Sequence, residues 1–145
     1  MQQLPHQYQM KATGGPVEHI HVGAPNINEL VIAPPLQFGG PGNEWSPEDL
    51  FMASITSCFI LSFRAIARAS KLTWISLECD SEGLLERIEG KTCFTKVVTT
   101  AHLVIPATET IENAEQLLHK ADKSCLVANS LTTEMQLKCV VKLGG

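Results

Sequence analysis

The sequence predicts an α+β domain in which an antiparallel sheet packs on a long buried central helix and a second helix. Three observations predict this class: one long uncharged stretch, several segments that alternate apolar and polar residues, and one segment with apolar residues at helical spacing. The predicted order is strands, helix, strands, helix, strand, without an internal repeat. With 145 residues, 44% of them hydrophobic, the chain can build one core, so we expect a single domain over residues 1–145.

The first predicted elements are two strands. The segment from Val17 to Val22 alternates apolar and polar residues, as a half-buried strand does, and Glu29 to Ile32 is its expected partner. The proline- and glycine-rich segment from Pro34 to Gly42 predicts a loop.

A long helix is predicted directly after this loop. In Ser46-Pro47-Glu48-Asp49, Ser46 is the expected cap, proline suits the first helical position, and Asp49 returns the capping-box bond. The helix is predicted from Pro47 to about Ser70. Between Leu50 and Phe63 it has no charge and apolar side chains on every face, so we expect it to be buried all round. A domain this small cannot cover it alone, and we expect a sheet to cover one part and a second protomer the other.

The next predicted elements form an antiparallel strand pair. The segment from Ile75 to Asp80 alternates apolar and polar residues, which predicts a strand. A turn is expected near Gly83 or Gly90, and the second strand is predicted from Cys93 to Ile105.

A second helix and a last strand complete the prediction. From Thr108 to Lys123 apolar residues recur at helical spacing, which predicts an amphipathic helix. A short connecting segment is expected from Ser124 to Leu131, and alternation from Met135 to Val141 predicts the final strand.

Composition excludes several classes of function. The net charge is -4, and the 11 Lys and Arg residues form no basic stripe, so no nucleic-acid partner is expected. No apolar run approaches the roughly 18 residues of a membrane span, and the N-terminus resembles no targeting segment, which predicts a cytoplasmic protein without a membrane partner. His19 and His21 share one side of a strand, yet with His6 they lack the further ligands of a metal site. No metal or cofactor is expected, and the histidines are interpreted as solvated or hydrogen-bonded.

The cysteines are the candidates for chemistry. Their number is odd and none forms a CxxC pair, which argues against a disulfide framework and a zinc ribbon. Cys58 has small polar neighbours within an otherwise apolar helix, and Cys125 follows a helix, which predicts a position nearer the surface. Local sequence leaves packing and reactivity open for both. The other three lie in strand patterns and are interpreted as packing residues: Cys79, Cys93 and Cys139.

Three segments carry a family resemblance. The sequence FGGPGNEWSPEDLFMASITSCF, from Phe38 to Phe59, resembles the signature of organic hydroperoxide resistance proteins, with a cysteine ten residues after the helix-start glutamate. Ala12-Thr13-Gly14-Gly15 resembles their N-terminal motif, and ADKSCLVANSL, residues 121–131, resembles their second cysteine motif, which usually reads Cys-Pro-Val-Ser. The chain is therefore similar, over nearly its whole length, to the OsmC/Ohr family.

The resemblance implies an OsmC-like fold, completed by an intertwined two-fold dimer, and a two-cysteine peroxidase of the oxidative stress response. In that role Cys58 attacks an organic hydroperoxide and becomes a sulfenic acid, which Cys125 resolves as a disulfide. A dithiol reductant, in this family often a dihydrolipoyl group, restores the pair. Glu48 is the family's helix-start glutamate and the third expected site residue.

One position departs from the family pattern. The family has an arginine directly after the Thr-Gly-Gly motif, held by the helix-start glutamate, whereas this chain has Pro16. A buried thiol needs a nearby cation to ionise. Lys11 lies close in sequence, and the arginines of the chain are Arg64, Arg68 and Arg87.

Glu48 itself has two interpretations. It is either a helix-start carboxylate favoured by the helix dipole or a partner of the thiol site. On a straight helix it lies roughly 15 Å along the axis from Cys58, too far for one cation to bridge both. If the two cooperate, Glu48 comes from the other protomer, which predicts an antiparallel two-fold dimer with facing central helices.

Two functions follow from these residues. The first is a thiol-dependent peroxidase that uses Cys58 and Cys125. The second is a diverged, non-peroxidase protein that binds a small apolar or thiol-reactive ligand in the dimer cleft. Loss of the arginine favours the second, and retention of both cysteines at family spacing favours the first.

Overall fold

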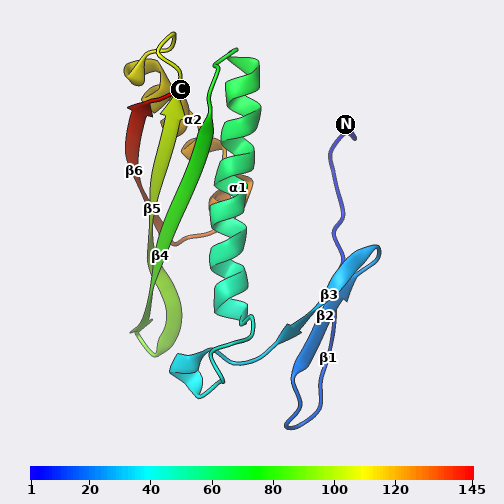
Figure 1. The fold of residues 1–145 in the computed structure, drawn as a ribbon. Coiled ribbons are helices and arrows are strands. Elements are labelled where there is room, and N and C mark those ends of the chain that lie inside the picture. Colours follow the sequence, from blue (N-terminus) through cyan, green and yellow to red (C-terminus); the bar gives the residue numbers. More distant parts are fainter. The chain divides into compact units, whose positions relative to one another are not determined.

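The computed structural model describes residues 1–145 as two compact units, residues 1–51 and residues 52–145. Helix α1, Pro47–Ala69, starts in the N-terminal unit and continues through the C-terminal unit (Figure 1). Its bounds match the predicted helix.

The N-terminal unit is built on a three-stranded antiparallel sheet in the order β1-β2-β3. Its strands are β1 (Lys11–Thr13), β2 (Ile20–Ala24) and β3 (Ile27–Ile32). The predicted pairing of the last two is confirmed, although β2 starts three residues later than expected, and β1 was not predicted. Asn26 adopts a positive φ of 64° in the tight turn between β2 and β3, a conformation that asparagine tolerates better than most residues.

A short 3-10 turn, η1 (Leu36–Phe38), leads into the start of α1. The predicted capping box is present: the Asp49 amide donates to Ser46 Oγ at 3.0 Å, and the Ser46 amide donates to Asp49 Oδ2 at 3.1 Å. The Ser46 hydroxyl also donates to the same carboxylate oxygen at 2.8 Å. Because Ser46 is fully buried, these bonds fix the first turn of the helix that carries Glu48.

The C-terminal unit contains a second three-stranded sheet in the order β4-β5-β6. Strands β4 (Ser76–Ile88) and β5 (Lys91–Ile105) form the predicted antiparallel pair, and the turn lies at Glu89 and Gly90, both with positive φ. Helix α2 (Ile111–Ser124) follows, capped by Thr110. Strand β6 (Glu134–Leu143) then pairs parallel to β5. The connecting segment contains a helix that the sequence did not predict, α3 (Leu126–Asn129).

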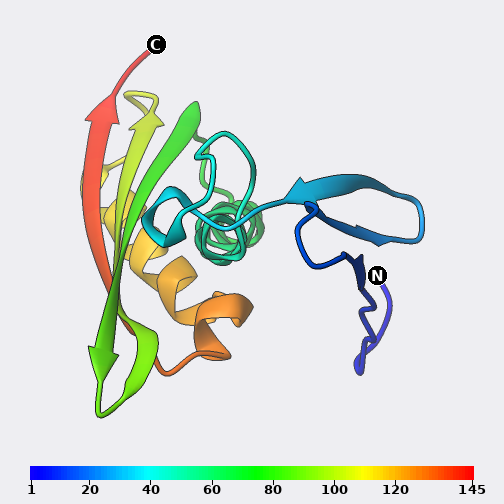
Figure 2. The same ribbon diagram turned by 90° about the horizontal axis from the view of Figure 1, so that it is seen from below.

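The core of the C-terminal unit lies between the sheet and the helices, which cover the same face of it (Figure 2). From α1, Phe59, Phe63 and Ala67 pack against Leu103 and Leu118 of this core. Within the single chain, α1 is covered by the sheet on one side, and cover of its other side by a second protomer stays a prediction. Its buried residues define one stripe, and Leu61 on another side is 56% exposed.

The length and composition of α1 also correct a sequence-based expectation. The helix is long and apolar enough to cross a membrane, contrary to the expectation that no apolar run approached that length. However, its stripe of Ile55, Phe59, Phe63 and Ala67 is buried, and three of these four side chains pack in the core described above. This packing identifies α1 as the core helix of a soluble domain.

Candidate active site

Cys58 and Cys125, which lie 67 residues apart in the sequence, meet in the C-terminal unit. Cys58 comes from α1, whereas Cys125 occupies the junction that ends α2 and starts α3. The Cys125 thiol is hydrogen-bonded to the sulfur of Cys58, and both cysteines are free thiols. The two residues are therefore placed to form one reactive pair.

The expected surface position of Cys125 is wrong. Cys125 is only 2% exposed. Leu118 and Ala121, on the preceding turns of α2, are fully buried in the core, and the chain continues from this buried face into α3. Cys125 therefore faces inward, toward α1.

The surroundings of Cys58 favour its ionised form without a cation. Burial alone would raise the pKa of the Cys58 thiol, but hydrogen bonds outweigh burial and lower this pKa below its ordinary value. The donors are the Val127 amide, the Cys125 thiol, the Ser62 hydroxyl and the Leu126 amide. Ser62 Oγ lies 4.0 Å from the sulfur. Since two donors are main-chain amides at the start of α3, backbone N–H groups supply stabilisation that an arginine was expected to provide.

Cys125 has the opposite character. Burial raises the pKa of the Cys125 thiol, and the hydrogen bond to Cys58 raises it further because that bond uses the Cys125 proton. The amides of Ala128 and Val127 oppose this shift without reversing it. The pair therefore combines a thiol whose pKa is lowered, Cys58, with a thiol whose pKa is raised, Cys125.

Glu48 lies in the N-terminal unit, in the first turn of α1. Its Oε2 atom is buried and has no hydrogen-bond partner. Its side chain contributes to the wall of an otherwise apolar cavity of about 260 Å³. No cation of the chain pairs with it, because the ion pairs present are His21 with Glu29 at 2.9 Å and His102 with Asp80 at 3.5 Å. Thus Lys11 does not take the place of the family arginine within the chain.

Arg64, Arg68 and Arg87 are all exposed and form no ion pair within the chain. None of them supplies a charge to Glu48 or contributes to the lowered pKa of Cys58.

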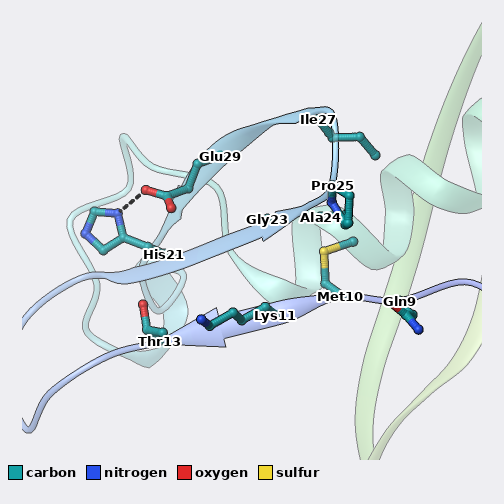
Figure 3. Close-up of a pocket in the computed structure, with 10 residues that line it drawn as sticks. All are labelled: Gln9, Met10, Lys11, Thr13, His21, Gly23, Ala24, Pro25, Ile27 and Glu29. Atoms are coloured by element: carbon teal, nitrogen blue, oxygen red, sulfur yellow. Dashed lines mark hydrogen bonds and ion pairs between the residues drawn. The ribbon is translucent and has the colours of Figure 1, made fainter.

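A cavity of about 590 Å³ lies over the N-terminal sheet and is lined by neither cysteine (Figure 3). Lys11 and Thr13 line it from β1, and His21 and Glu29 from the two neighbouring strands. Nδ1 of His21 bonds Oε1 of Glu29, in agreement with the interpretation of His21 as a hydrogen-bonded histidine. No three histidine, cysteine or acidic residues come together as metal ligands.

The remaining cysteines do not join the pair. Cys79 and Cys139 pack against the core, which confirms the packing interpretation. Burial, followed by the charges of Asp80, Cys139 and Glu78, raises the pKa of Cys79 to about 11. Burial also raises the pKa of Cys139, with smaller effects from Glu115 and Asp122. Cys93 is exposed near the turn between β4 and β5.

Sequence reasoning missed the amides of Leu126 and Val127. A four-residue helix leaves almost no periodic signal, and cysteine is not among the usual N-cap residues. The position of Cys125 could have indicated these amides, because the first residues of a helix have backbone N–H groups without a partner inside the helix.

By its fold and its paired thiols, the chain is a small α+β protein in which two cysteines from different helices meet. The model for the family described as OsmC-like protein matches residues 40–140, and the chain belongs to this family.

Two similar proteins cover nearly the whole chain. The uncharacterized protein YmaD of Bacillus subtilis is 26% identical over 147 residues, which cover 97% of each chain. A crystal structure from Legionella pneumophila, described as an organic hydroperoxide resistance protein OsmC, predicted redox protein, is 27% identical with a TM-score of 0.76. It covers 97% of this chain and 99% of that one.

An OsmC-like protein of unknown function from Vibrio cholerae superposes with a TM-score of 0.86 at 21% identity, covering 94% of this chain and all of that one. At this identity the likeness concerns the fold alone. The predicted α+β, OsmC-like fold is confirmed.

Proposed function

We propose that the protein is a thiol-dependent peroxidase that reduces organic hydroperoxides through Cys58 and Cys125. The observation that carries the proposal is the polarised cysteine pair, in which Cys125 and two α3 amides donate to the Cys58 sulfur. A peroxidatic thiol must be ionised near neutral pH, and a second thiol must lie within reach to resolve it. The organic hydroperoxide resistance proteins among the similar structures support this reaction class.

In the first step, the Cys58 thiolate attacks the distal oxygen of ROOH. An S–O bond forms, the O–O bond breaks, and the alkoxide leaves and takes a proton to become ROH. Cys58 becomes a sulfenic acid, which corresponds to a two-electron oxidation of sulfur. Apolar side chains around α1 favour an organic over an inorganic peroxide.

In the second step, the Cys125 sulfur attacks the Cys58 sulfenic acid. A disulfide forms, and the hydroxyl group leaves as water with the proton that Cys125 held. This step protects Cys58 from further oxidation. A dithiol reductant, for which a lipoyl group is the expected source, then reduces the disulfide by thiol–disulfide exchange and is itself oxidised to a disulfide. No bound cofactor takes part in the proposed cycle.

The proposed assembly is an antiparallel two-fold homodimer in which Glu48 of one protomer completes the site of the other. The exposed side of α1, which includes Leu61, supports an interface there. Charge supports the orientation: Glu48 and Asp49 lie in the first turn of α1, while Arg64 and Arg68 lie in its second half. An antiparallel pair of helices places opposite charges together. A monodisperse monomer in light scattering at micromolar concentration would contradict this assembly.

The odd number of cysteines and the absence of a CxxC pair argue against the disulfide framework of a secreted protein. We accordingly propose a cytoplasmic protein of the OsmC type that acts in the response to oxidative stress.

The test is anaerobic stopped-flow mixing of the reduced protein with cumene hydroperoxide, monitored by thiol loss. The wild type is expected to consume peroxide at least a hundredfold faster than free cysteine. Its rate should rise with pH through an apparent pKa below the free-thiol value of about 8.5 and then level off. Cys58→Ser should react no faster than free cysteine, and Cys125→Ser should stop at the sulfenic acid, trapped with dimedone.

Cys93→Ser is the matched control, because Cys93 is exposed and lies outside the pair. It should retain wild-type rates. If the wild type reacts no faster than free cysteine, the peroxidase proposal is rejected. The remaining function is then that of a diverged protein that binds a small apolar or thiol-reactive ligand in the dimer cleft. The proline at position 16, in place of the family arginine, favours that alternative.

A further inference from the structure

One cysteine outside the Cys58–Cys125 pair lies against a histidine. Cys139 belongs to β6, an edge strand of its sheet, and its side chain packs on the core face. Helix α2 packs against β6 on that face (Figure 2) and places His119 beside the sulfur. The distance from Cys139 Sγ to His119 Nε2 is 3.9 Å. The two side chains take no part in the proposed peroxidase cycle.

Two carboxylates accompany this contact. Glu115 and Asp122 lie four residues before and three residues after His119, so the three side chains follow one face of α2. The charges of both carboxylates act on the Cys139 sulfur. Because His119 is exposed and Cys139 is only half-buried, an ion can reach the sulfur from the edge of the sheet. Negative charge nearby disfavours a free thiolate at this position and favours a bound cation.

The distance between the two atoms indicates which cation fits. Zinc forms bonds of about 2.3 Å to sulfur and about 2.0 Å to nitrogen, so a tetrahedral angle requires the two ligand atoms to lie about 3.5 Å apart. The observed 3.9 Å corresponds to a wider angle at an ion between them. No group of three histidine, cysteine or acidic residues is placed to hold a metal ion. An ion that accepts only two protein ligands at a wide angle is therefore favoured over zinc, and thiolate with imidazole suits Cu(I).

We propose that Cys139 and His119 together bind one Cu(I) ion. On binding, the Cys139 thiol releases its proton to solvent, and the thiolate and the neutral Nε2 atom become the two ligands. The charges of Glu115 and Asp122 attract the ion without coordinating it. The copper keeps its oxidation state. The proposal is independent of the peroxidase reaction, since it requires neither Cys58 nor Cys125.

Anaerobic titration with Cu(I) in competition with bicinchoninate, a chromogenic Cu(I) chelator, tests the site. The Cys58–Cys125 pair offers two further thiols to Cu(I), so the Cys58→Ser/Cys125→Ser variant serves as the parent for all titrations. This parent should bind one Cu(I) per chain. Cys139→Ser and His119→Gln, each made in the parent, should weaken binding at least tenfold. X-ray absorption of the copper-loaded parent should show one sulfur and one nitrogen at bonding distance.

Cys93→Ser, made in the same parent, is the matched control. It removes a more exposed thiol outside the cluster and should bind Cu(I) as the parent does. Circular dichroism and thermal melting establish that all variants are folded. Equal Cu(I) binding by the parent and Cys139→Ser overturns the proposal, and so does equal binding by the parent and His119→Gln. A loss of binding in Cys93→Ser, or a parent that takes no Cu(I) from bicinchoninate, likewise overturns it.

Discussion

The two compact units differ in how well each buries its own apolar side chains. The C-terminal unit buries fourteen hydrophobic residues and exposes seven large ones, whereas the N-terminal unit buries only Ile32 and Ala33 and exposes ten. An isolated small sheet is marginally stable in water unless something covers its apolar face. The C-terminal unit therefore has a core of its own, while the N-terminal unit leaves apolar surface that the proposed second protomer would cover.

The candidate functional groups are also distributed unequally between the two units. All five cysteines lie in the C-terminal unit, whereas Glu48 and the two cavities described above lie in the N-terminal unit. The thiol pair is therefore held by a packed core, and the unpaired carboxylate belongs to the unit that exposes more apolar surface. Four measurements test this difference between the two units.

The largest effect is expected from the core of the C-terminal unit. Phe63 is fully buried and contacts Trp74 edge-on, with ring centroids 5.5 Å apart. Phe63→Ala should lower the free energy of unfolding by about 3–5 kcal/mol, measured by urea denaturation, because it leaves a cavity. Leu61→Ala, on the exposed side of the same helix, should cost below about 1 kcal/mol in the monomer. Equal effects of the two substitutions would contradict the one-sided packing of α1.

The next largest effect concerns the helix caps, one in each unit. Ser46→Ala should lower the free energy of unfolding by about 2 kcal/mol, because it removes a buried cap and two of the three hydrogen bonds between residues 46 and 49. Thr110→Ala should cost about 1 kcal/mol or less, since Thr110 is exposed and accepts a longer bond, 3.3 Å, from the Asn113 amide. Thr110→Ser keeps the hydroxyl and should behave as wild type. A larger loss for Thr110→Ala would reverse the expected ranking.

The third measurement is hydrogen exchange of the N-terminal sheet as a function of protein concentration. If a second protomer covers this sheet, amides in β2 and β3 should exchange at least tenfold more slowly at 100 µM than at 1 µM, about 1.4 kcal/mol. Amides of β5, between two strands of the C-terminal unit, should show no such dependence. If the exchange rates in both sheets did not depend on protein concentration, the idea that a second protomer covers the N-terminal sheet would be contradicted.

The smallest effect is a loss of stability at alkaline pH that belongs to the C-terminal unit. The pKa of Cys79 is raised from 9.0 to about 11 in the folded protein, so folding holds the thiol proton more tightly. This contribution is complete below pH 9 and is lost as the pH rises through about 11. After allowance for partial exposure, it amounts to about 1 kcal/mol.

Urea denaturation between pH 8 and pH 11 measures this contribution. Cys79→Ala should flatten the decline, and Cys93→Ala, at an exposed position, should not. An identical pH dependence in Cys79→Ala and wild type would assign the decline to other groups.

Much of the fold was predictable because its signals are local. Ser46 and Asp49 specify the start of α1 through bonds three residues apart, and alternation in β5 and β6 reports which side chains face the core. Strand β1 and helix α3 were missed because three or four residues carry too little periodicity to distinguish them from loop.

The pairing of Cys58 with Cys125 was also predictable, from the motifs around these two cysteines. Their electrostatics were not. The sequence, with Pro16 in place of an arginine, suggested an unstabilised thiol, whereas amide hydrogens after Cys125 lower the pKa of Cys58.

Local patterns in the chain were thus enough to predict the class of fold, the long helix with its capped start, and the pairing of the two cysteines. Only the tertiary structure decided that Cys125 is buried, that its proton and the amides of α3 point to Cys58, and that Oε2 of Glu48 has no partner. The physical reason is that helix and strand signals arise between near neighbours in the chain. Burial and hydrogen bonding at a site depend instead on residues that folding brings together from distant positions.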